Sequence, residues 1–420
     1  METNANNLAK QALKYGVLFL IFHAFMSFFR ANMTLMMPCL MMFITEDMGI
    51  SLAQAGMFYQ VPSTVMGIGM LAGSVIIDRF GAYKTLIIAM ITQVAASVIG
   101  WLAPGYGLTI VSRVVFGISM ALSYPAVMAI VAERFHNQKQ RGIASAVIQS
   151  TNCATNVATQ RISVPVFMAL AQNYHSQQLI WGVGALLCCV VFAIADRKQI
   201  SFFKQYNQQF TENVKAVAEE EKEASGISLL KAIKIRKVWA AVIAFTGATW
   251  LYTMYCNYLP TILKTVHGLT PAEASNVTSL INTVGIIVCL LTGVLIRKLK
   301  DFKLPMVLCM ITLTAGGVVA AIAAPGFLMT LAMVLIGIGW FCFIPIVNTA
   351  VMMSKGVTPK IFAAGTALWT VLGCVLCLFM PKLFGVLTAT CGMQKAVLWM
   401  CLGGIIAISG ALYYPGKEEN

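Results

Sequence analysis

The sequence predicts an all-α polytopic membrane protein, with twelve transmembrane helices arranged as two pseudo-symmetric six-helix bundles. Of its 420 residues, 59% are hydrophobic and only 10% are charged, and the mean hydropathy is +0.81. A soluble protein of this size carries about a quarter charged residues. The apolar residues form separate continuous runs of about 20 residues, the length that crosses a bilayer as a helix. They do not alternate with period two, as the strands of a membrane barrel do.

The apolar runs define six helices on each side of a long hydrophilic connection. We expect these helices at 14–45, 52–77, 86–103, 108–134, 142–172, 179–196, 238–262, 273–296, 304–324, 327–353, 361–386 and 394–414. The connection 197–237 divides an N-terminal bundle (1–196) from a C-terminal bundle (238–420). Its charged stretch FTENVKAVAEEEKEASG predicts a short amphipathic helix on the cytoplasmic surface. The first run is too long for a cleavable signal peptide.

The net charge of +14 is concentrated in alternate connections. The basic residues cluster at Lys10 and Lys14, Arg79 and Lys84, Arg134 to Arg141, Arg197 to Lys237, Arg297 to Lys303, and Lys355 and Lys360. The connections TEDMGIS, APGYG and NYHSQQ, which lie between them, contain no lysine or arginine. This pattern predicts a multi-pass protein of the cell inner membrane with both termini in the cytoplasm. The charge therefore reflects topology and not a surface for nucleic acid.

The 12 cysteines are scattered mostly through apolar runs, without a Cys/His spacing typical of a metal site. We expect them to be small, reduced core residues rather than disulfides or metal ligands. The apolar runs also contain no nucleophile–base arrangement and no HExxH motif. We therefore expect no enzymatic activity, no metal and no cofactor, and we expect a monomer.

The two halves contain matching segments at nearly one displacement. GISMALSYP (Gly117 to Pro125) recurs as GIGWFCFIP (Gly337 to Pro345), 220 positions later. FFRANMTLMMP (Phe28 to Pro38) corresponds to WLYTMYCNYLP (Trp250 to Pro260), which aligns Arg30 with Tyr252. Repeated six-helix halves are typical of secondary transporters, whose substrate site lies near the membrane midplane between the repeats.

The loop after the second helix carries a family signature. Its sequence GSVIIDRFGAYK, from Gly73 to Lys84, resembles the signature loop of the major facilitator superfamily, with Asp78, Arg79, Gly81 and Lys84 at the matching positions. The leading glycine stands one place early, and the equivalent loop GVLIRKLKDFK of the second half is degraded. The resemblance implies the fold of that superfamily over the whole chain.

The same resemblance implies a gate at the cytoplasmic helix ends. Asp78 would pair with Arg79, Arg134, Arg141 or a helix N-terminus in one conformation and separate in the other. The alternative is that these residues only set the topology and the turn, in which Gly81 supplies the backbone freedom.

A closer resemblance is to organic-anion carriers of the anion:cation symporter type. Their first helix carries Asp-Arg-x-Asn, and here Arg30 and Asn32 match while Phe29 stands in place of the aspartate. Arg113 matches the arginine of their fourth helix, but Met120 replaces a glutamate. Those carboxylates are implicated in proton coupling in the family, so their absence implies another form of coupling.

Three arginines lie in or near the membrane core, and every acidic residue lies in a loop or at a helix end. An arginine at a helix centre costs about 2.5–3.5 kcal/mol on insertion scales, which predicts a water-filled cavity and an anion within it. We expect Arg30, on one helical face with His23, Ser27 and Thr34, to bind that anion. The alternative is a structural cation bonded to backbone carbonyls.

The other two arginines are weaker candidates for substrate binding. Arg113 lies close enough to its helix start to extend toward the outer surface. Arg161 follows a polar stripe formed by Gln149, Asn152, Asn156 and Gln160, but it points away from this stripe and could contact a neighbouring helix.

The predicted substrate site is completed by polar and aromatic residues. From the first half these are Asn32, Thr34, Gln149 and Asn152, and from the second half Thr249, Tyr252, Cys256, Asn282, Asn348 and Trp369. Polar groups within the membrane are expensive and often functional, but they also join helices.

The sequence thus predicts a transporter of a small organic anion, a carboxylate, that works by alternating access as an exchanger or uniporter. Arginine suits a carboxylate because its guanidinium donates two parallel hydrogen bonds. Two alternatives remain open: a proton-coupled symporter in which His23 titrates, and an efflux carrier for drugs or other hydrophobic compounds, with a lining of methionine and phenylalanine.

Overall fold

The computed structural model describes residues 2–135, 138–195, 199, 201–203, 231–296, 299, 301–354, 357 and 359–416. Within these ranges, the side chains of residues 2–9, 71, 74, 78, 138, 139, 359, 360 and 363 are not described. All regular elements in the described residues are helices. Most of the central connection, and with it the amphipathic helix predicted there, lies outside the described residues.

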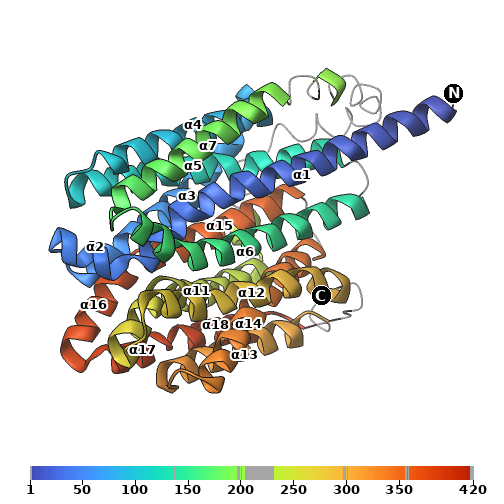
Figure 1. Ribbon diagram of the computed structural model, residues 1–420. Coiled ribbons are helices and arrows are strands. Elements are labelled where there is room, and N and C mark those ends of the chain that lie inside the picture. The colour runs from blue at the N-terminus through green and yellow to red at the C-terminus, as the bar shows by residue number, and fades with distance from the viewer. Residues whose placement is uncertain are drawn as a thin grey trace.

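The helices form two bundles that lie one above the other in Figure 1. The N-terminal bundle contains α1 (Glu2–Cys39), α2 (Met41–Met48), α3 (Leu52–Phe80), α4 (Ala82–Trp101), α5 (Tyr106–Arg134), α6 (Gln138–Ala169) and α7 (Tyr174–Ala195). The C-terminal bundle contains α11 (Arg236–His267), α12 (Pro271–Leu295), α13 (Lys303–Ile322), α14 (Phe327–Met352), α15 (Pro359–Cys377), α16 (Met380–Cys391), α17 (Met393–Met400) and α18 (Gly403–Tyr413). Both termini lie at one end of the molecule, and α2, α16 and α17 lie at the other, which we call the outer end (Figure 1).

Ten helices among the described residues are long and apolar enough to cross a membrane. The remaining two of the twelve predicted helices are α3 and α6, with 29 and 32 residues. The polar stripe of α6 lowers the apolar content of this helix, because all four positions of the stripe are asparagine or glutamine. The prediction of an all-α polytopic membrane protein is confirmed.

Three predicted helices are interrupted. The helix expected at 14–45 divides at Leu40 into α1 and α2, and the helix expected at 361–386 divides at Leu378 and Phe379 into α15 and α16. The helix expected at 394–414 divides near Cys401 into α17 and α18. Proline explains the first two breaks: Pro38 occupies the last turn of α1, and a proline stands in the first turn of α16, where its missing N–H costs nothing.

Corresponding helices of the two bundles begin and pack alike. Both α3 and α12 start with a capping box, Ser51 with Gln54 and Thr270 with Glu273. In each bundle a glycine brings two helices together: a Cβ on Gly117 of α5 would lie 2.8 Å from a backbone oxygen of α3, and one on Gly337 of α14 would lie 2.7 Å from a backbone oxygen of α12. These contacts support the internal repeat that the sequence predicts.

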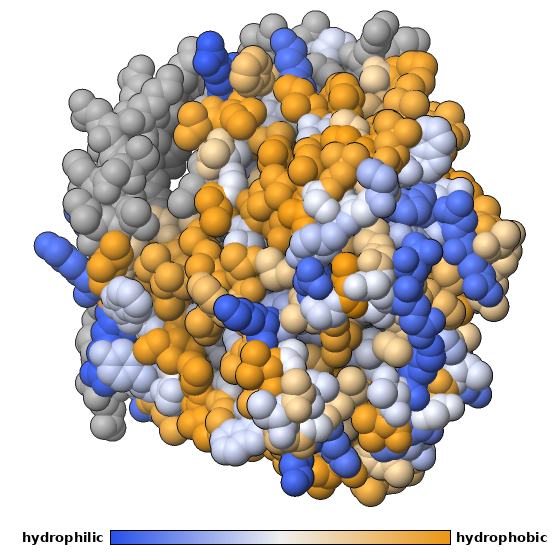
Figure 2. All heavy atoms as spheres, turned by 90° about the vertical axis from the view of Figure 1, so that its left-hand side faces the viewer, coloured by the Kyte–Doolittle hydropathy of each residue, from blue (hydrophilic) through white to orange (hydrophobic). Residues whose placement is uncertain are grey.

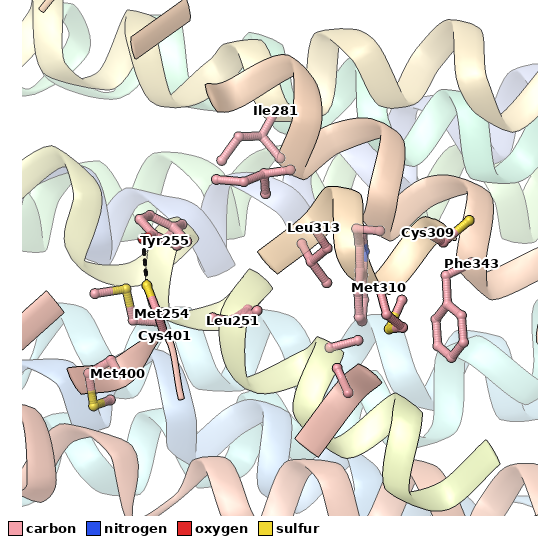
Figure 3. Packing of buried hydrophobic residues seen from close by; sticks show 14 of the residues in the cluster. Leu251, Met254, Tyr255, Ile281, Cys309, Met310, Leu313, Phe343, Met400 and Cys401 are labelled. Atoms are coloured by element: carbon pink, nitrogen blue, oxygen red, sulfur yellow. Dashed lines mark hydrogen bonds between the residues drawn. The ribbon is translucent and has the colours of Figure 1, made fainter. Parts of the chain in front are cut away.

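The core of the C-terminal bundle is packed with aliphatic and sulfur-containing side chains around α11 (Figure 3). Tyr255 of α11 is fully buried, and its hydroxyl donates to the carbonyl of Gly317 and lies 3.4 Å from the sulfur of Cys401. All 12 cysteines are free, and all but Cys342 and Cys391 are buried. The cysteines are therefore core residues, as predicted.

The two bundles are tightly joined toward the outer end. Gln60 of α3 donates to the carbonyl of Cys377 at 2.6 Å, and Thr64 donates to the carbonyl of Cys374 at 3.0 Å. Gly56 of α3 lies directly against Tyr258 of α11, with no room for a side chain. Figure 2 views the molecule from this end, where hydrophilic and hydrophobic residues are interspersed over the surface. The outer end of the interface is thus closed.

Candidate functional site

Arg30 lies on α1 and reaches across to α6 in the N-terminal bundle. Its Nη2 donates to Asn152 Oδ1 at 3.0 Å and to Ser27 Oγ at 3.3 Å. Thr34, one turn further along α1, donates to the carbonyl of Arg30 at 2.9 Å. The α-helical period places these α1 side chains on one face, as the sequence predicts.

The polar stripe of α6 supports Arg30 from the opposite side. Asn152 Oδ1 accepts a second hydrogen bond from Ser27 Oγ at 2.6 Å, and Asn152 Nδ2 donates to Gln149 Oε1 at 3.1 Å. Ser27 Oγ also lies 3.1 Å from Thr155 Oγ1. The Asn152 amide is therefore oriented with its oxygen toward the guanidinium, because both of its ends are occupied.

The other half of the same stripe contacts the C-terminal bundle. Asn156 donates to Asn282 Oδ1 at 3.3 Å, and Asn282 Nδ2 donates to Gln160 Oε1 at 3.2 Å. The hydroxyl of Tyr252, on α11, donates to the same Asn282 oxygen at 3.2 Å. Tyr252 also stacks on Trp340 of α14, with ring centroids 4.5 Å apart and planes 6° from parallel.

We call this region the polar junction, formed by Arg30, Ser27, Asn152 and Gln149 on one side and by Asn156, Gln160, Asn282, Tyr252 and Trp340 on the other. Helix α6 contributes to both sides, and its contacts with α1 and α12 are extensive. The junction combines one cation, several neutral amides and an aromatic platform.

The charge of Arg30 is not neutralised within the described part of the chain. Its hydrogen-bond acceptors there are a hydroxyl and an amide oxygen, both neutral. Tyr124 of α5, which is 37% exposed and uncharged, lies within electrostatic range of the guanidinium. A partly buried cation in the membrane core without an anionic partner favours the binding of an anion.

His23 lies two turns before Arg30 on the same face of α1. It is 2% exposed, and neither ring nitrogen has a hydrogen-bond partner among the described residues, although Asn152 is close. A buried polar group without a partner is unusual in a folded protein.

Arg113 occupies a different environment from Arg30. It is completely buried, and its guanidinium donates to the carbonyl of Met33 at 2.7 Å and to Gln178 Oε1 at 2.6 Å. These bonds connect α5 to α1 and α7. In this conformation Arg113 is a helix-joining cation and does not extend toward the outer surface.

Arg161 is exposed, and its Nε lies 3.4 Å from Ser279 Oγ of α12. It therefore contacts a neighbouring helix, the alternative that its position beside the α6 stripe had left open. In this conformation neither Arg113 nor Arg161 makes a hydrogen bond to the residues around Arg30.

The remaining predicted site residues are distributed more widely. Asn32 is buried and donates to the Phe28 carbonyl at 2.8 Å, and Trp369 is buried against Phe245. Thr249, Cys256 and Asn348 lie on α11 and α14 without a hydrogen bond to Arg30 or Asn282. Asn156, Gln160 and Tyr124 belong to the junction or its surroundings but are missing from the predicted site. Asn156 and Gln160 could have been predicted, because they belong to the polar stripe of α6 together with Gln149 and Asn152.

The predicted gating residues whose side chains the structure describes do not form one cluster. The side chain of Asp78 lies outside the described residues, and Arg79 and Lys84 are exposed. Gly81 has φ 82° and ψ 154°, a conformation largely restricted to glycine, so it makes the turn between α3 and α4.

The two arginines of the predicted gate hold different segments. Arg134 is buried and donates to the Tyr15 carbonyl and to Gln199 Oε1, both at 2.9 Å. Arg141 donates to the carbonyls of Phe135 and Ala132 at the end of α5, at 2.6 and 3.0 Å. Arg141 thus satisfies helix-terminal carbonyls, which is a favourable position for a cation.

Replacing Arg113 with methionine is expected to destabilise the protein. The change leaves the Met33 carbonyl and the Gln178 side-chain oxygen without their donor, at a cost of about 1–3 kcal/mol for each buried group. Thermal unfolding of the purified protein measures the effect. Arg161→Met is the matched control, because Arg161 is exposed and makes one long hydrogen bond. Equal losses in the two variants would contradict the structural role of Arg113.

The two-bundle fold, with a polar junction at its centre, is that of a membrane transporter. Residues 19–381 match the model of the Major Facilitator Superfamily, and the chain therefore belongs to this superfamily. The identification expected from the signature loop is confirmed.

Two curated relatives match part of the chain. A hexuronate transporter of Bacillus subtilis (strain 168) is 24% identical over 236 residues, which are 56% of this chain and 54% of the relative. The uncharacterized transporter YybO of the same organism is 24% identical over 246 residues, 54% of this chain and 52% of the relative. The chain thus spans about half the length of the curated relatives that it matches.

Solved structures share the fold at low identity. A POT family transporter in complex with 5-aminolevulinic acid aligns with a TM-score of 0.68 and 13% identity, over 94% of each chain. A mutant of the nucleoside transporter NupG aligns with a TM-score of 0.69 and 14% identity, over 95% of this chain and 99% of that one. At these identities the likeness concerns the fold alone.

Proposed function

We propose that the protein transports a small organic anion by alternating access, with Arg30 binding the carboxylate. The observation that carries this proposal is the guanidinium of Arg30, which is held by Ser27 and Asn152 and has no anionic partner in the described part of the chain. An organic carboxylate supplies the missing charge and accepts parallel hydrogen bonds from the guanidinium. The predicted substrate class thus remains the best explanation of this site.

The chemistry of the junction favours a sugar acid within this class. Its amides, from Gln149 to Asn282, supply both donors and acceptors for several hydroxyl groups. The stacked Tyr252 and Trp340 rings offer an apolar surface for the face of a sugar ring. The partial similarity to a hexuronate transporter supports the same choice.

Exchange is the form of coupling that the charges favour. The acidic residues of the sequence lie in loops and at helix ends, so the junction offers no carboxylate as a proton carrier. An empty site that carries one unpaired positive charge through the membrane is expensive to reorient, and a bound anion removes that cost. The site then reorients fastest when it carries an anion on the inward step and another on the outward step.

Counterflow in proteoliposomes tests both substrate class and coupling. Vesicles preloaded with a hexuronate are expected to accumulate labelled hexuronate without a pH gradient, and empty vesicles are expected to take up far less. Preloading with the uncharged parent hexose is the matched control for osmotic effects. Uptake that requires a pH gradient and no internal anion would contradict exchange.

Proton coupling through His23 is the second candidate, because its two ring nitrogens are buried without a described partner beside Asn152. In that case His23→Gln would abolish uptake driven by a pH gradient and preserve counterflow. Equal counterflow and equal gradient-driven uptake in this variant would exclude His23 as the proton carrier.

We propose supporting roles for the other predicted residues. Arg113 positions α1 through the Met33 carbonyl, and Arg161 joins α6 to α12 through Ser279. Gating by Asp78 and the basic residues near it remains part of the proposal, together with the closure of the outer end by Gly56 and its neighbours.

A further inference from the structure

A second concave site lies away from the polar junction, between α1 and α7. These helices lie side by side (Figure 1). They enclose a cavity of about 410 Å³ whose walls are almost entirely apolar. Its lining includes Leu18, Phe22, Phe25 and Phe29 from α1, and Leu187 and Val191 from α7.

This cavity opens on the side of the protein that faces the membrane. Phe25 is 59% exposed and Leu187 is 62% exposed, although both are large apolar residues. Both helices are among the candidate membrane spans. The occupant of the opening is therefore drawn from the bilayer and not from water.

The length of the cavity matches one leaflet of a membrane. Leu18 and Phe29 are its first and last lining residues on α1. With a rise of 1.5 Å per residue, they are about 16 Å apart along the helix. The hydrocarbon core of a bilayer is about 30 Å thick, so one leaflet measures about 15 Å.

Positive charge lies at the end of the cavity that is nearest to the termini. Arg134 lines this end, held over the ring of Phe19 at 4.8 Å, and Gln199 lies beside it. Lys14 is exposed one turn before Leu18 and continues the same face of α1. Basic residues at this level attract the phosphate of an anionic headgroup.

We propose that this cavity binds one acyl chain of a phospholipid from the leaflet on the side of the termini. The chain lies along α1 from Leu18 to Phe29, and the phosphate lies near Lys14. The apolar walls and the match to one leaflet suit an acyl chain. The basic end favours a lipid with an anionic headgroup over one with a neutral headgroup.

The end of the acyl chain that lies near Phe29 then contacts α1 beside Arg30. Phe29 precedes Arg30 and packs directly against Gly184 of α7, where no side chain would fit. The ring of Phe28 meets Phe29 and Trp181 edge-on, at 5.5 and 5.9 Å. Lipid in the cavity thus stabilises the α1–α7 contact directly behind Arg30.

Photo-crosslinking of the full-length protein in vesicles tests the proposal. The probe is a phosphatidylglycerol with a photoreactive diazirine in one acyl chain, and the crosslinked residues are identified by peptide mass spectrometry. The α1 and α7 lining residues are expected to be labelled more strongly than Leu291 and Val294 of α12, which are equally exposed to lipid at 62% and 63%. A phosphatidylcholine probe is expected to label the cavity less.

Val191→Trp fills the cavity and is expected to reduce its labelling about tenfold. This factor corresponds to the loss of the burial of roughly two methylene groups of the acyl chain. Leu291→Trp, at an exposed position that does not line this cavity, is the control and leaves labelling unchanged. If Val191→Trp does not fold, Lys14→Glu provides a second test, because it removes the headgroup contact and lowers labelling by phosphatidylglycerol alone. Uniform labelling of all lipid-facing helices, or labelling unaffected by both variants, would overturn the proposal. Transport is not the readout, so the outcome is independent of the anion site.

Discussion

Replacing Arg30 with lysine is expected to abolish high-affinity binding of the transported anion. Lysine keeps the positive charge but has a single donor group in place of the planar fork. Hydrogen bonds to charged groups contribute about 1.5–3 kcal/mol each, so the loss of one corresponds to roughly 10–150-fold weaker binding. Arg30→Ala removes the charge as well and is expected to eliminate both binding and counterflow.

The measurement is thermal stabilisation of the purified protein by a series of mono-, di- and tricarboxylates, sugar acids and phosphate esters. Ligand binding raises the midpoint of unfolding in proportion to ln(1 + [L]/Kd), so the shift reports affinity before the substrate is known. Arg236→Lys is the matched control, because Arg236 begins α11 and packs over Tyr413, away from the polar junction. An unchanged shift in Arg30→Lys would remove Arg30 from the proposed binding site.

Replacing Gly56 with leucine is expected to prevent closure of the outer end. Gly56 of α3 lies directly against Tyr258 of α11, and Pro381 of α16 would lie 3.1 Å from a Cβ at this position. Overpacking a close contact costs about 1–3 kcal/mol. If this cost applies only to the conformation closed at the outer end, the ratio of the two conformations changes by about 5–150-fold. Transport is expected to fall because each cycle must pass through the closed conformation.

Disulfide formation between introduced cysteines measures the closure directly. Ala53 and Gly385 face each other across the outer end, and a Cβ on Gly385 would lie 2.9 Å from Cβ of Ala53. The pair Ala53→Cys and Gly385→Cys is expected to crosslink readily in the parent and poorly when Gly56→Leu is added. Gly107→Leu is the control, since Gly107 is at the outer end with no atom within 4 Å of its Cβ position. Crosslinking that persists with Gly56→Leu would show that this contact does not limit closure.

The α1 face and the α6 stripe could be predicted because each depends on the period of a single helix. His23, Ser27, Arg30 and Thr34 recur at helical spacing, and the structure places Ser27 and Arg30 together on Asn152. Gln149 belongs to the same network, as its position in the stripe indicates. The periodicity of one chain segment was sufficient because all of these residues lie on only two helices.

The partners of the arginines could not be predicted in the same way. Arg113 is bonded to Met33 and Gln178, which are 80 and 65 positions away in the sequence. Asn282 meets Gln160 from another bundle, 122 positions away. Such pairs depend on the relative rotation and depth of packed helices, and neither quantity is encoded in the local pattern.

By itself, the sequence determined the membrane-spanning all-α fold, its internal repeat, its superfamily and the presence of a cation without a nearby acid in the membrane core. These properties follow from composition and local spacing. The hydrocarbon core requires long apolar helices, and a charged residue within such a helix is rare and easily recognised in the sequence. Only the tertiary structure decided that Arg30 faces Asn152, that Arg113 instead joins helices, and that the outer end is closed. The physical reason is that hydrogen-bond partners within a membrane protein are selected by helix packing, which brings together residues far apart in the chain.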